Sequence, residues 1–281
     1  MARLGHLAVW AGLYVAGASA FLIGFAAPPA SARPRILLAL FVAFLTGMAT
    51  YLFDRVKLAD ERLDPADRAS NPERYLFLAS RAPALRLACA LLAATAAFLG
   101  DRLDSLVPPL VLASLTGVFL YGGRPRAFRG TARCSRPKDL FLLKNAAIAT
   151  SITAFACALD HLARLAPPAA SSAPLLGALF LLVFSDSVLC DIEDREADRS
   201  FRTDTVPALH GEESAWLAAG LAQVGFTVLL FAYDTGPLAV LWVVSTTLSF
   251  LALAVLRPKA LRDFVDARLA VLAVLAWLLV G

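Results

Sequence analysis

The chain has 281 residues, of which 59% are hydrophobic and 17% are charged, and its formal net charge at pH 7 is +4. Soluble globular domains are about 45–50% apolar, so this composition excludes an ordinary soluble protein and indicates a helical membrane protein. The modest positive charge fits contact with anionic lipid headgroups and gives no reason to expect nucleic-acid binding.

Apolar runs long enough to cross a hydrocarbon core of about 30 Å recur along the whole chain. The first run is longer than the apolar region of a signal peptide, so we interpret it as a membrane span. We predict an all-α polytopic bundle of nine transmembrane helices, forming a single domain over residues 1–281 around a central apolar cavity. The expected spans are 7–27, 35–55, 83–100, 106–122, 140–160, 174–190, 214–232, 236–255 and 266–280.

Positive charge is divided unevenly between the two sides that nine spans define. One side holds the N-terminus and the connections after the even-numbered spans, and all but four of the 26 Lys and Arg lie there if Arg86 is counted with it. The exceptions are Arg33, Arg35, Arg102 and Arg164. The positive-inside rule therefore predicts a cytoplasmic N-terminus, cytoplasmic active-site loops and an external C-terminus, in a bacterial-type inner membrane.

The connections on the predicted cytoplasmic side are long and polar, whereas the outer ones are short. The connection after span 2 is charged and contains Pro65 and Pro72, and the one after span 4 is rich in arginine. Positive-inside topology alone would enrich arginine there. Because loops held by a rigid scaffold often carry function, we expect the functional site at this end.

One acidic stretch follows the sixth apolar run. Asp191, Asp194 and Asp198 stand at i, i+3 and i+7, which places all three carboxylates on one stripe of a helix. Three such carboxylates repel one another unless a cation lies among them. Mg²⁺ typically takes one or two carboxylates together with substrate phosphates, so the stretch predicts a metal–diphosphate site at a membrane surface. The alternative is an acidic helix end that is merely solvated.

The nine spans and this stretch together resemble the UbiA-type intramembrane prenyltransferases. Those nine-helix proteins use Mg²⁺ and two Asp-rich motifs to transfer a polyprenyl group from its diphosphate to an acceptor. Asp191, Asp194 and Asp198 match the second motif, Asp-x-x-Asp-x-x-x-Asp, in full. The segment from Thr205 through Pro207 to Gly211 is similar to the family's Thr-Leu-Pro…Gly segment, which follows that motif.

The match extends to the region between spans 4 and 5. Tyr121 stands where the family often has a tyrosine at the end of span 4, and Lys144 and Asn145 match a Lys-Asn pair at the start of span 5. Lys144 begins an apolar span, where a charge is costly and so is more often functional.

The first motif, Asn-Asp-x-x-Asp-x-x-x-Asp in the family, is degenerate in this chain. Of its three acids only Asp54 is retained, and the other aligned positions read Thr50, Tyr51 and Leu58. On a continued helix Lys57 and Glu61 would share a stripe with Asp54. We hypothesise that Lys57 contacts the diphosphate directly as a point charge, and that Glu61 replaces a lost metal ligand.

The resemblance implies Mg²⁺ as cofactor, with a polyprenyl diphosphate, an unidentified prenyl acceptor and membrane lipid as partners. The implied metal ligands are Asp54, Asp191, Asp194 and Asp198, with Glu61 added by the hypothesis above. Lys144 and Tyr121 join the four aspartates as catalytic residues, and the substrate-binding residues are Lys57, Arg74, Arg133 and Asn145.

Three functions remain open on the sequence. The first is transfer of a prenyl group to an aromatic or lipid-like acceptor. The second is a UbiA-like terpene cyclase, in which the allylic cation is captured internally. The third is a diverged, non-catalytic isoprenoid-binding protein. The weakened first motif favours the third function, and the intact second motif argues against it.

Overall fold

The structure is a computed structural model that describes residues 2–26, 30–56, 72–122, 141–163, 173–201, 203–258 and 261–280. These ranges contain helices and turns, without any strand. The helices are α1 (Ala2–Ala26), η1 (Ala30–Ala32), α2 (Arg33–Val56), α4 (Pro72–Asp101), α5 (Val107–Gly122), α6 (Leu143–Leu162), α7 (Ala173–Phe201), α8 (Val206–His210), α9 (Glu212–Tyr233), α10 (Pro237–Leu256) and α11 (Leu261–Val280).

Each predicted span corresponds to one long helix in the described part of the chain. Six of these helices, α1, α2, α4, α7, α9 and α10, are long and apolar enough to cross a membrane, and α5 is apolar but shorter. The all-α class and the membrane character are therefore confirmed. Crossing by α5, α6 and α11, and with it the count of nine, stays a prediction.

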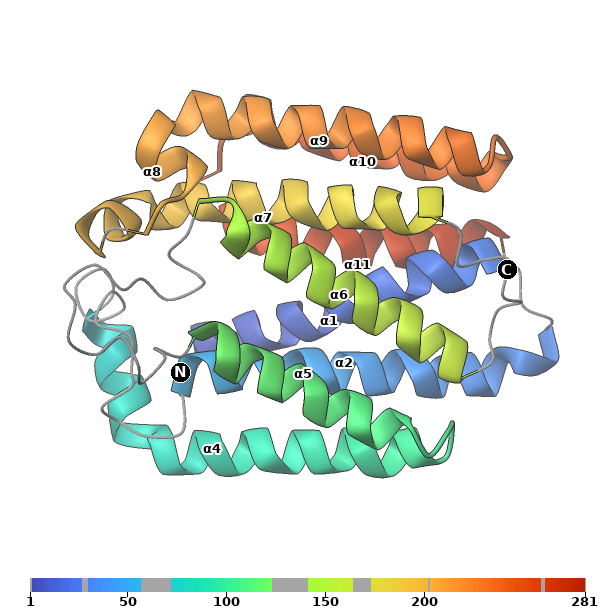
Figure 1. Cartoon of the computed structure of the whole chain (residues 1–281), viewed down its shortest axis with the longest axis horizontal. Coiled ribbons are helices and arrows are strands. Elements are labelled where there is room, and N and C mark those ends of the chain that lie inside the picture. Colours follow the sequence, from blue (N-terminus) through green and yellow to red (C-terminus); the bar gives the residue numbers. More distant parts are fainter. Residues whose placement is uncertain are drawn as a thin grey trace.

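The start of α4 differs from the prediction of a span over 83–100. The helix begins at Pro72, eleven residues earlier, and continues through Pro83. Proline is well suited to the first helical position, because the N–H it lacks would have no partner there. Inside a helix proline causes a kink, and α4 is visibly bent in its N-terminal part (Figure 1). The prediction that Pro72 lies in the connection before this helix was wrong.

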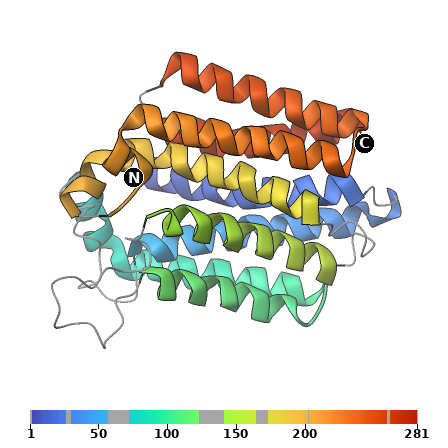
Figure 2. The same cartoon turned by 45° about the horizontal axis from the view of Figure 1, so that its top comes forward.

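Neighbouring helices in the sequence are also neighbours in space. Each long helix contacts the next one along the chain, and α11 packs against α1, so that the contacts close into a ring. In Figures 1 and 2, α4 and α5 lie toward one side of this ring and α9 and α10 toward the opposite side. Additional contacts of α1 with α6 and of α11 with α7 run across the ring.

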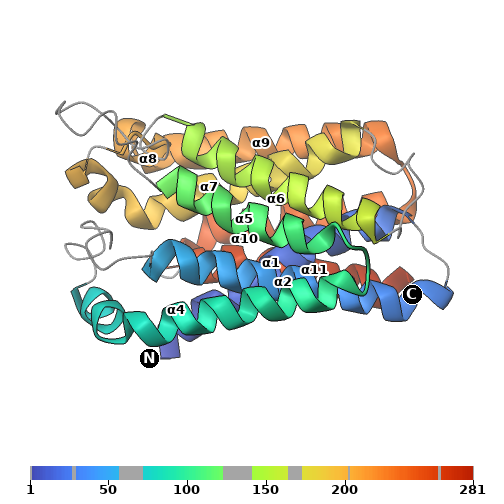
Figure 3. The same cartoon turned by 60° about the horizontal axis from the view of Figure 1, so that its bottom comes forward.

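The helix ends are sorted between the two ends of the bundle. The end of α2, the start of α6 and the end of α7 lie at the same end as the N-terminus, and the C-terminus lies at the other (Figures 1 and 3). This arrangement gathers the motif-bearing helix ends on one side, as the sequence predicts.

Large apolar side chains are exposed in helical stripes on the outer helices. On α9 they recur at intervals of three or four residues, which is the period of one helix face. Exposed patches of this extent are rare on soluble monomers, whereas lipid tails would cover them in a membrane. The residues on α9 and α10 include Leu217, Leu221, Val224, Val228, Val244, Leu248, Leu251 and Val255.

An arginine joins three helix ends at the end of the bundle opposite the acidic motif. Arg35, in the first turn of α2, donates from Nε to the carbonyl oxygen of Ala163 and from Nη2 to that of Leu103, both at 2.6 Å. These carbonyls follow α6 and α4, where the last C=O groups of a helix have no partner within it. Arg35 therefore ties the start of α2 to the ends of both helices.

Helices α1 and α2 approach each other through glycine. A Cβ atom built on Gly47 would lie 2.9 Å from the Gly12 Cα and 2.9 Å from the Ala11 carbonyl oxygen, and one on Gly12 would lie 2.7 Å from the Phe44 carbonyl oxygen. Small residues at such crossings let helix backbones pack closely within a membrane.

Replacing Gly47 by Leu is therefore expected to force α1 and α2 apart. Overpacking of this kind costs about 1–3 kcal/mol. Thermal unfolding of the detergent-solubilised protein would measure the loss. Gly117→Leu in α5 is the matched control, because a Cβ atom there meets nothing within 4 Å. Equal stability of the two variants would contradict the close crossing.

Candidate functional site

The acidic stripe on α7 lies between two other helices at the N-terminal end of the bundle. The start of α6 contributes Lys144 and Asn145, and the start of α11 contributes Arg262. The three carboxylates do not all point in the same direction, because the side chain at i+3 is rotated about the helix axis by about 60° from the side chain at i. Asp191 and Asp198 therefore meet α6, whereas Asp194 meets α11.

Lys144 is the counter-charge on the α6 side. Its Nζ lies 2.6 Å from Asp191 Oδ1 and 3.7 Å from Asp198 Oδ2. The side chain of Lys144 is 16% exposed and that of Asp191 only 3%. A buried pair of this kind persists only where the charges compensate each other and make further hydrogen bonds.

Asn145 supplies the further bonds. Its Nδ2 donates to Asp191 Oδ2 at 2.9 Å and to Ser187 Oγ at 3.0 Å. Since a carboxylate only accepts, the amide nitrogen must be the group that faces Asp191. The amide oxygen Oδ1 is then left buried, with no hydrogen-bond donor among the described residues.

A strained residue fixes the entrance to α6. Leu142 adopts φ 57° and ψ −17°, in the left-handed region that leucine rarely occupies. Its side chain packs against an apolar cluster that includes Val188 and Leu189 of α7. Strain of this kind persists where the surrounding packing over-determines it. Here the packing holds Lys144 and Asn145, which follow directly, against the stripe.

Arg262 is the counter-charge on the α11 side, and it is not among the residues predicted from the sequence. Its Nη2 donates to Asp194 Oδ2 at 2.7 Å and to the Cys190 carbonyl oxygen at 3.2 Å. Its backbone N–H donates to Glu193 Oε1 at 2.8 Å. The start of α11 is thereby attached to about one helical turn of α7, from Cys190 to Asp194.

The segment after α7 folds back onto the last aspartate. Thr205 Oγ1 donates to Asp198 Oδ2 at 3.1 Å. Pro207 is then accommodated in the first turn of the short helix α8. Gly211 ends α8 at φ 87°, a conformation that favours glycine. The Thr-x-Pro…Gly pattern therefore has a structural reason, which is to close the acidic end of α7.

A second charged cluster lies deeper in the bundle. Asp186 on α7 forms a buried ion pair with Arg268 on α11, and Tyr14 on α1 donates to Asp186 Oδ2 at 2.9 Å. All three side chains are at least nine-tenths buried. Charged residues inside apolar helices indicate such pairing, but Asp186 and Arg268 are not among the residues predicted from the sequence.

The remaining predicted residues lie at the same end of the bundle or outside the described ranges. Asp54 stands near the end of α2 and Tyr121 near the end of α5. The neighbouring Arg55 is close enough to Asp194 for its charge to act on that carboxylate. Arg74 belongs to the first turn of α4. Lys57, Glu61 and Arg133 lie outside the described residues.

The donor set at the stripe is compatible with a divalent cation. Among the described residues, no group of three His, Cys, Asp or Glu side chains converges closely enough to form a metal cage. Mg²⁺ does not need one, because it keeps several waters and takes one or two carboxylates plus substrate phosphates. The unpaired acceptor Asn145 Oδ1 fits a site in which a bound water or substrate supplies the missing donor.

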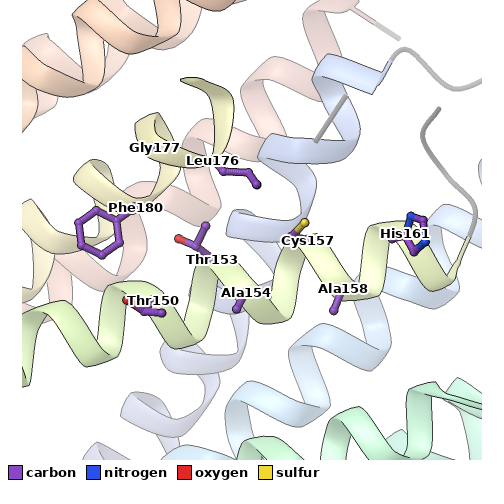
Figure 4. Close-up of a pocket in the computed structure, with 9 residues that line it drawn as sticks. All are labelled: Thr150, Thr153, Ala154, Cys157, Ala158, His161, Leu176, Gly177 and Phe180. Carbon is purple, nitrogen blue, oxygen red and sulfur yellow. The ribbon is translucent and has the colours of Figure 1, made fainter. Parts of the chain in front are cut away.

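An open apolar groove of about 650 Å³ lies between α6 and α7, toward their other ends (Figure 4). It is lined by Thr150, Thr153, Ala154, Cys157, Ala158, His161, Leu176, Gly177 and Phe180. The groove lies beside the bundle rather than at its centre, so the predicted central cavity stays a prediction.

The sequence matches no protein-family model and no curated protein. Solved structures do match. An apo UbiA homologue from Aeropyrum pernix K1 is 18% identical with a TM-score of 0.62, covering 96% of this chain and 98% of that one. A UbiA homologue from Archaeoglobus fulgidus is 13% identical with a TM-score of 0.69, covering 100% and 97%.

The Archaeoglobus fulgidus homologue has also been solved bound to DMAPP and Mg²⁺. That structure is 13% identical with a TM-score of 0.61, covering 96% of this chain and 98% of that one. The likeness extends over almost the whole of both chains in each case. The chain therefore has the UbiA fold, and the structural resemblance expected from its motifs is confirmed.

Proposed function

From the UbiA fold and the charged cluster at one end of the bundle, we infer that this chain is an integral membrane prenyltransferase. It moves a polyprenyl group from its diphosphate to an acceptor that is aromatic or lipid-like. The Mg²⁺- and DMAPP-bound homologue supports the substrate class and the cofactor.

One observation carries this proposal: Lys144 and Arg262 are held by three carboxylates where apolar helices end. Cations fixed in advance beside a metal-binding stripe provide the kind of preorganised field that stabilises a leaving diphosphate.

In the proposed reaction the bond between C1 of the prenyl group and the diphosphate oxygen breaks, and both electrons leave with the diphosphate. A bound Mg²⁺ would polarise this leaving group and neutralise its developing charge. Lys144 and Arg262 orient the phosphate oxygens by charge-assisted hydrogen bonds. The acceptor then forms a new bond to C1 and loses a proton.

Apolar surface for the isoprenoid tail is available along the helices. The groove between α6 and α7 is apolar and open at the side, which suits a lipid-borne chain (Figure 4). Phe184 stacks on Phe180 with ring centroids 6.1 Å apart, on the same helix as the acidic stripe. Aromatic faces attract cations by about 0.5–2 kcal/mol, so Phe184 is a candidate to stabilise the allylic cation.

The function is tested with membranes that contain the protein, incubated with labelled farnesyl or geranylgeranyl diphosphate, Mg²⁺ and a panel of acceptors. Diphosphate release with a prenylated acceptor supports the transferase. A cyclic hydrocarbon would instead support the cyclase, and the absence of Mg²⁺-dependent turnover the non-catalytic alternative. The matched controls are Asp194→Asn, expected to be inactive, and Glu196→Gln, whose side chain is 87% exposed on the same helix.

A further inference from the structure

The buried cluster of Tyr14, Asp186 and Arg268 plays no part in holding the diphosphate. We propose that this cluster binds the prenyl acceptor, and that Arg268 selects an acceptor with an uncharged hydroxyl or carbonyl group by donating hydrogen bonds to its oxygen. The inference rests on the proposed transferase function and narrows its substrate class. Ionisable residues inside apolar helices are rare, and they commonly mark a functional site.

The cluster lies deeper in the bundle than the residues assigned to the diphosphate. Asp186 stands five residues before Asp191 on α7, and Arg268 stands six residues after Arg262 on α11. At the rise of an α-helix these offsets correspond to about 7.5 and 9 Å along the two helices. Because the prenyl tail is apolar, it enters the bundle below its phosphates, and C1 lies toward this deeper layer. An acceptor that attacks C1 has to be bound there too.

Arg268 has hydrogen-bond donors that no described residue uses. Its Nη2 donates to Asp186 Oδ1, whereas Nε and Nη1 are buried without an acceptor among the described residues. The side chain is 3% exposed, so bulk water does not reach these nitrogens. Buried donors without a partner are costly and rare in native proteins. An oxygen atom of a bound molecule would supply the acceptor that they lack.

The charge around the cluster favours an uncharged group over an anion. Asp186 already neutralises Arg268, and Asp266 on α11 places another carboxyl group close enough to act on Asp186. An anionic group bound here would be a buried charge without a counter-charge, which is costly. A hydroxyl or carbonyl oxygen accepts hydrogen bonds from the guanidinium and adds no charge.

Neighbouring groups hold the guanidinium in position. Tyr14 donates to Asp186 Oδ2 at 2.9 Å, on the oxygen that Arg268 does not contact. A Cβ atom built on Gly17 would lie 2.9 Å from the carbonyl oxygen of Leu269, so α1 packs directly on the backbone of α11 beside Arg268. A binding group fixed in advance loses little freedom when its ligand arrives, which favours binding.

The layer between this cluster and the acidic stripe is partly open. Cys190 stands one turn after Asp186 on α7, and Asp266 stands one turn after Arg262 on α11, and both are partly exposed. Cys190 is close enough to Asp186 and Arg262 to interact electrostatically with each. This layer therefore offers an acceptor a route to Arg268 from the end of the bundle that holds the diphosphate.

The test measures binding and needs no turnover. Two pairs of probes differ in charge within each pair: methyl para-hydroxybenzoate against para-hydroxybenzoate, and butylglycerol against its phosphate ester. Binding to the detergent-solubilised protein is measured by titration calorimetry, with Mg²⁺ and a non-ionisable thiolo analogue of geranyl diphosphate present. We expect an uncharged probe to bind at least about tenfold more tightly than its anionic counterpart, because the anion would be buried without a counter-charge.

Two variants remove the free donors in different ways. Arg268→Lys keeps a positive charge beside Asp186 but has a single nitrogen, which the ion pair occupies, and the double variant Arg268→Met, Asp186→Leu removes both charges together. Each should weaken binding of the uncharged probe by at least about tenfold and leave binding of the diphosphate analogue within about twofold. Gln223→Leu is the matched control, because it removes a buried hydrogen bond to Thr246 between α9 and α10. It should leave probe binding unchanged.

Thermal unfolding of each variant controls for folding. Full binding of the uncharged probe by either Arg268 variant, a preference for the anionic probes, or no binding of any probe to the parent protein would overturn the inference. Binding of an uncharged probe that the Arg268 variants lose, in a protein to which the diphosphate analogue does not bind, would support this binding site and refute the proposed prenyltransferase function.

Discussion

Lys144→Met should lower kcat/KM for the prenyl diphosphate by at least about 100-fold. Removing one preorganised donor to a developing negative charge typically costs about 10²–10³ in rate. The Nζ atom of Lys144 is held 2.6 Å from Asp191 Oδ1, and its side chain is 16% exposed. Lys144 is the one lysine in the part of the chain that the structure describes. Methionine keeps the length and apolar stem of the side chain and removes only the charge.

The size of this effect is measured by steady-state kinetics at saturating Mg²⁺. Arg257→Met is the matched control, because Arg257 is an exposed cation paired with Glu213 at the same end of the bundle. We expect that control to stay within about twofold of the parent protein, as surface ion pairs contribute little. A Lys144→Met variant that keeps more than half of its activity would remove Lys144 from the mechanism.

The largest loss of stability is expected at the buried pair of Asp186 and Arg268. Removing one partner of such a pair leaves an uncompensated charge and costs about 3–5 kcal/mol. Arg268→Met should therefore lower the free energy of unfolding by about that amount. Tyr14 still donates one hydrogen bond to the carboxylate of Asp186 that is left behind.

The double variant Arg268→Met, Asp186→Leu distinguishes charge from packing. Replacing both partners by apolar residues of similar size is often neutral, so the double variant should regain most of the lost stability. Denaturant or thermal unfolding in detergent would measure all three proteins. A double variant no more stable than Arg268→Met would show that the pair acts through shape and not through charge.

The fold could be predicted largely because membrane helices follow from length and hydropathy. The residues at which the helices begin and end were harder to predict, as the start of α4 shows. Pro72 looks like a helix breaker in the sequence, yet it stands at the first helical position, where its geometry is favourable. Single residues decide such boundaries, and only the tertiary structure reveals which way they act.

The acidic stripe could also be predicted, because its i, i+3, i+7 spacing requires nothing beyond helical geometry. The residues that form ion pairs and hydrogen bonds with these three aspartates could not be predicted. Arg262 meets Asp194 across 68 residues of sequence, and one of several cations near the helix ends had to be chosen. Asp186 and Arg268 did leave a usable pattern, since charged residues inside apolar spans nearly always have a partner.

The orphaned oxygen of Asn145 shows a further limit of sequence reasoning. The resemblance to the family places a Lys-Asn pair at this position, and the motif alone assigns both residues to the substrate. Only the contacts reveal that the amide nitrogen is committed to Asp191 and Ser187, which leaves the oxygen as the available group.

Arg35 has a consequence for the order in which the protein assembles. Its two acceptors, Leu103 and Ala163, are translated 68 and 128 residues later. A nascent chain that ends before α6 therefore lacks one of these two acceptors. Arg35 can therefore join the three helix ends only after α6 has been inserted. This contact can be complete before α7 and its acidic stripe are added.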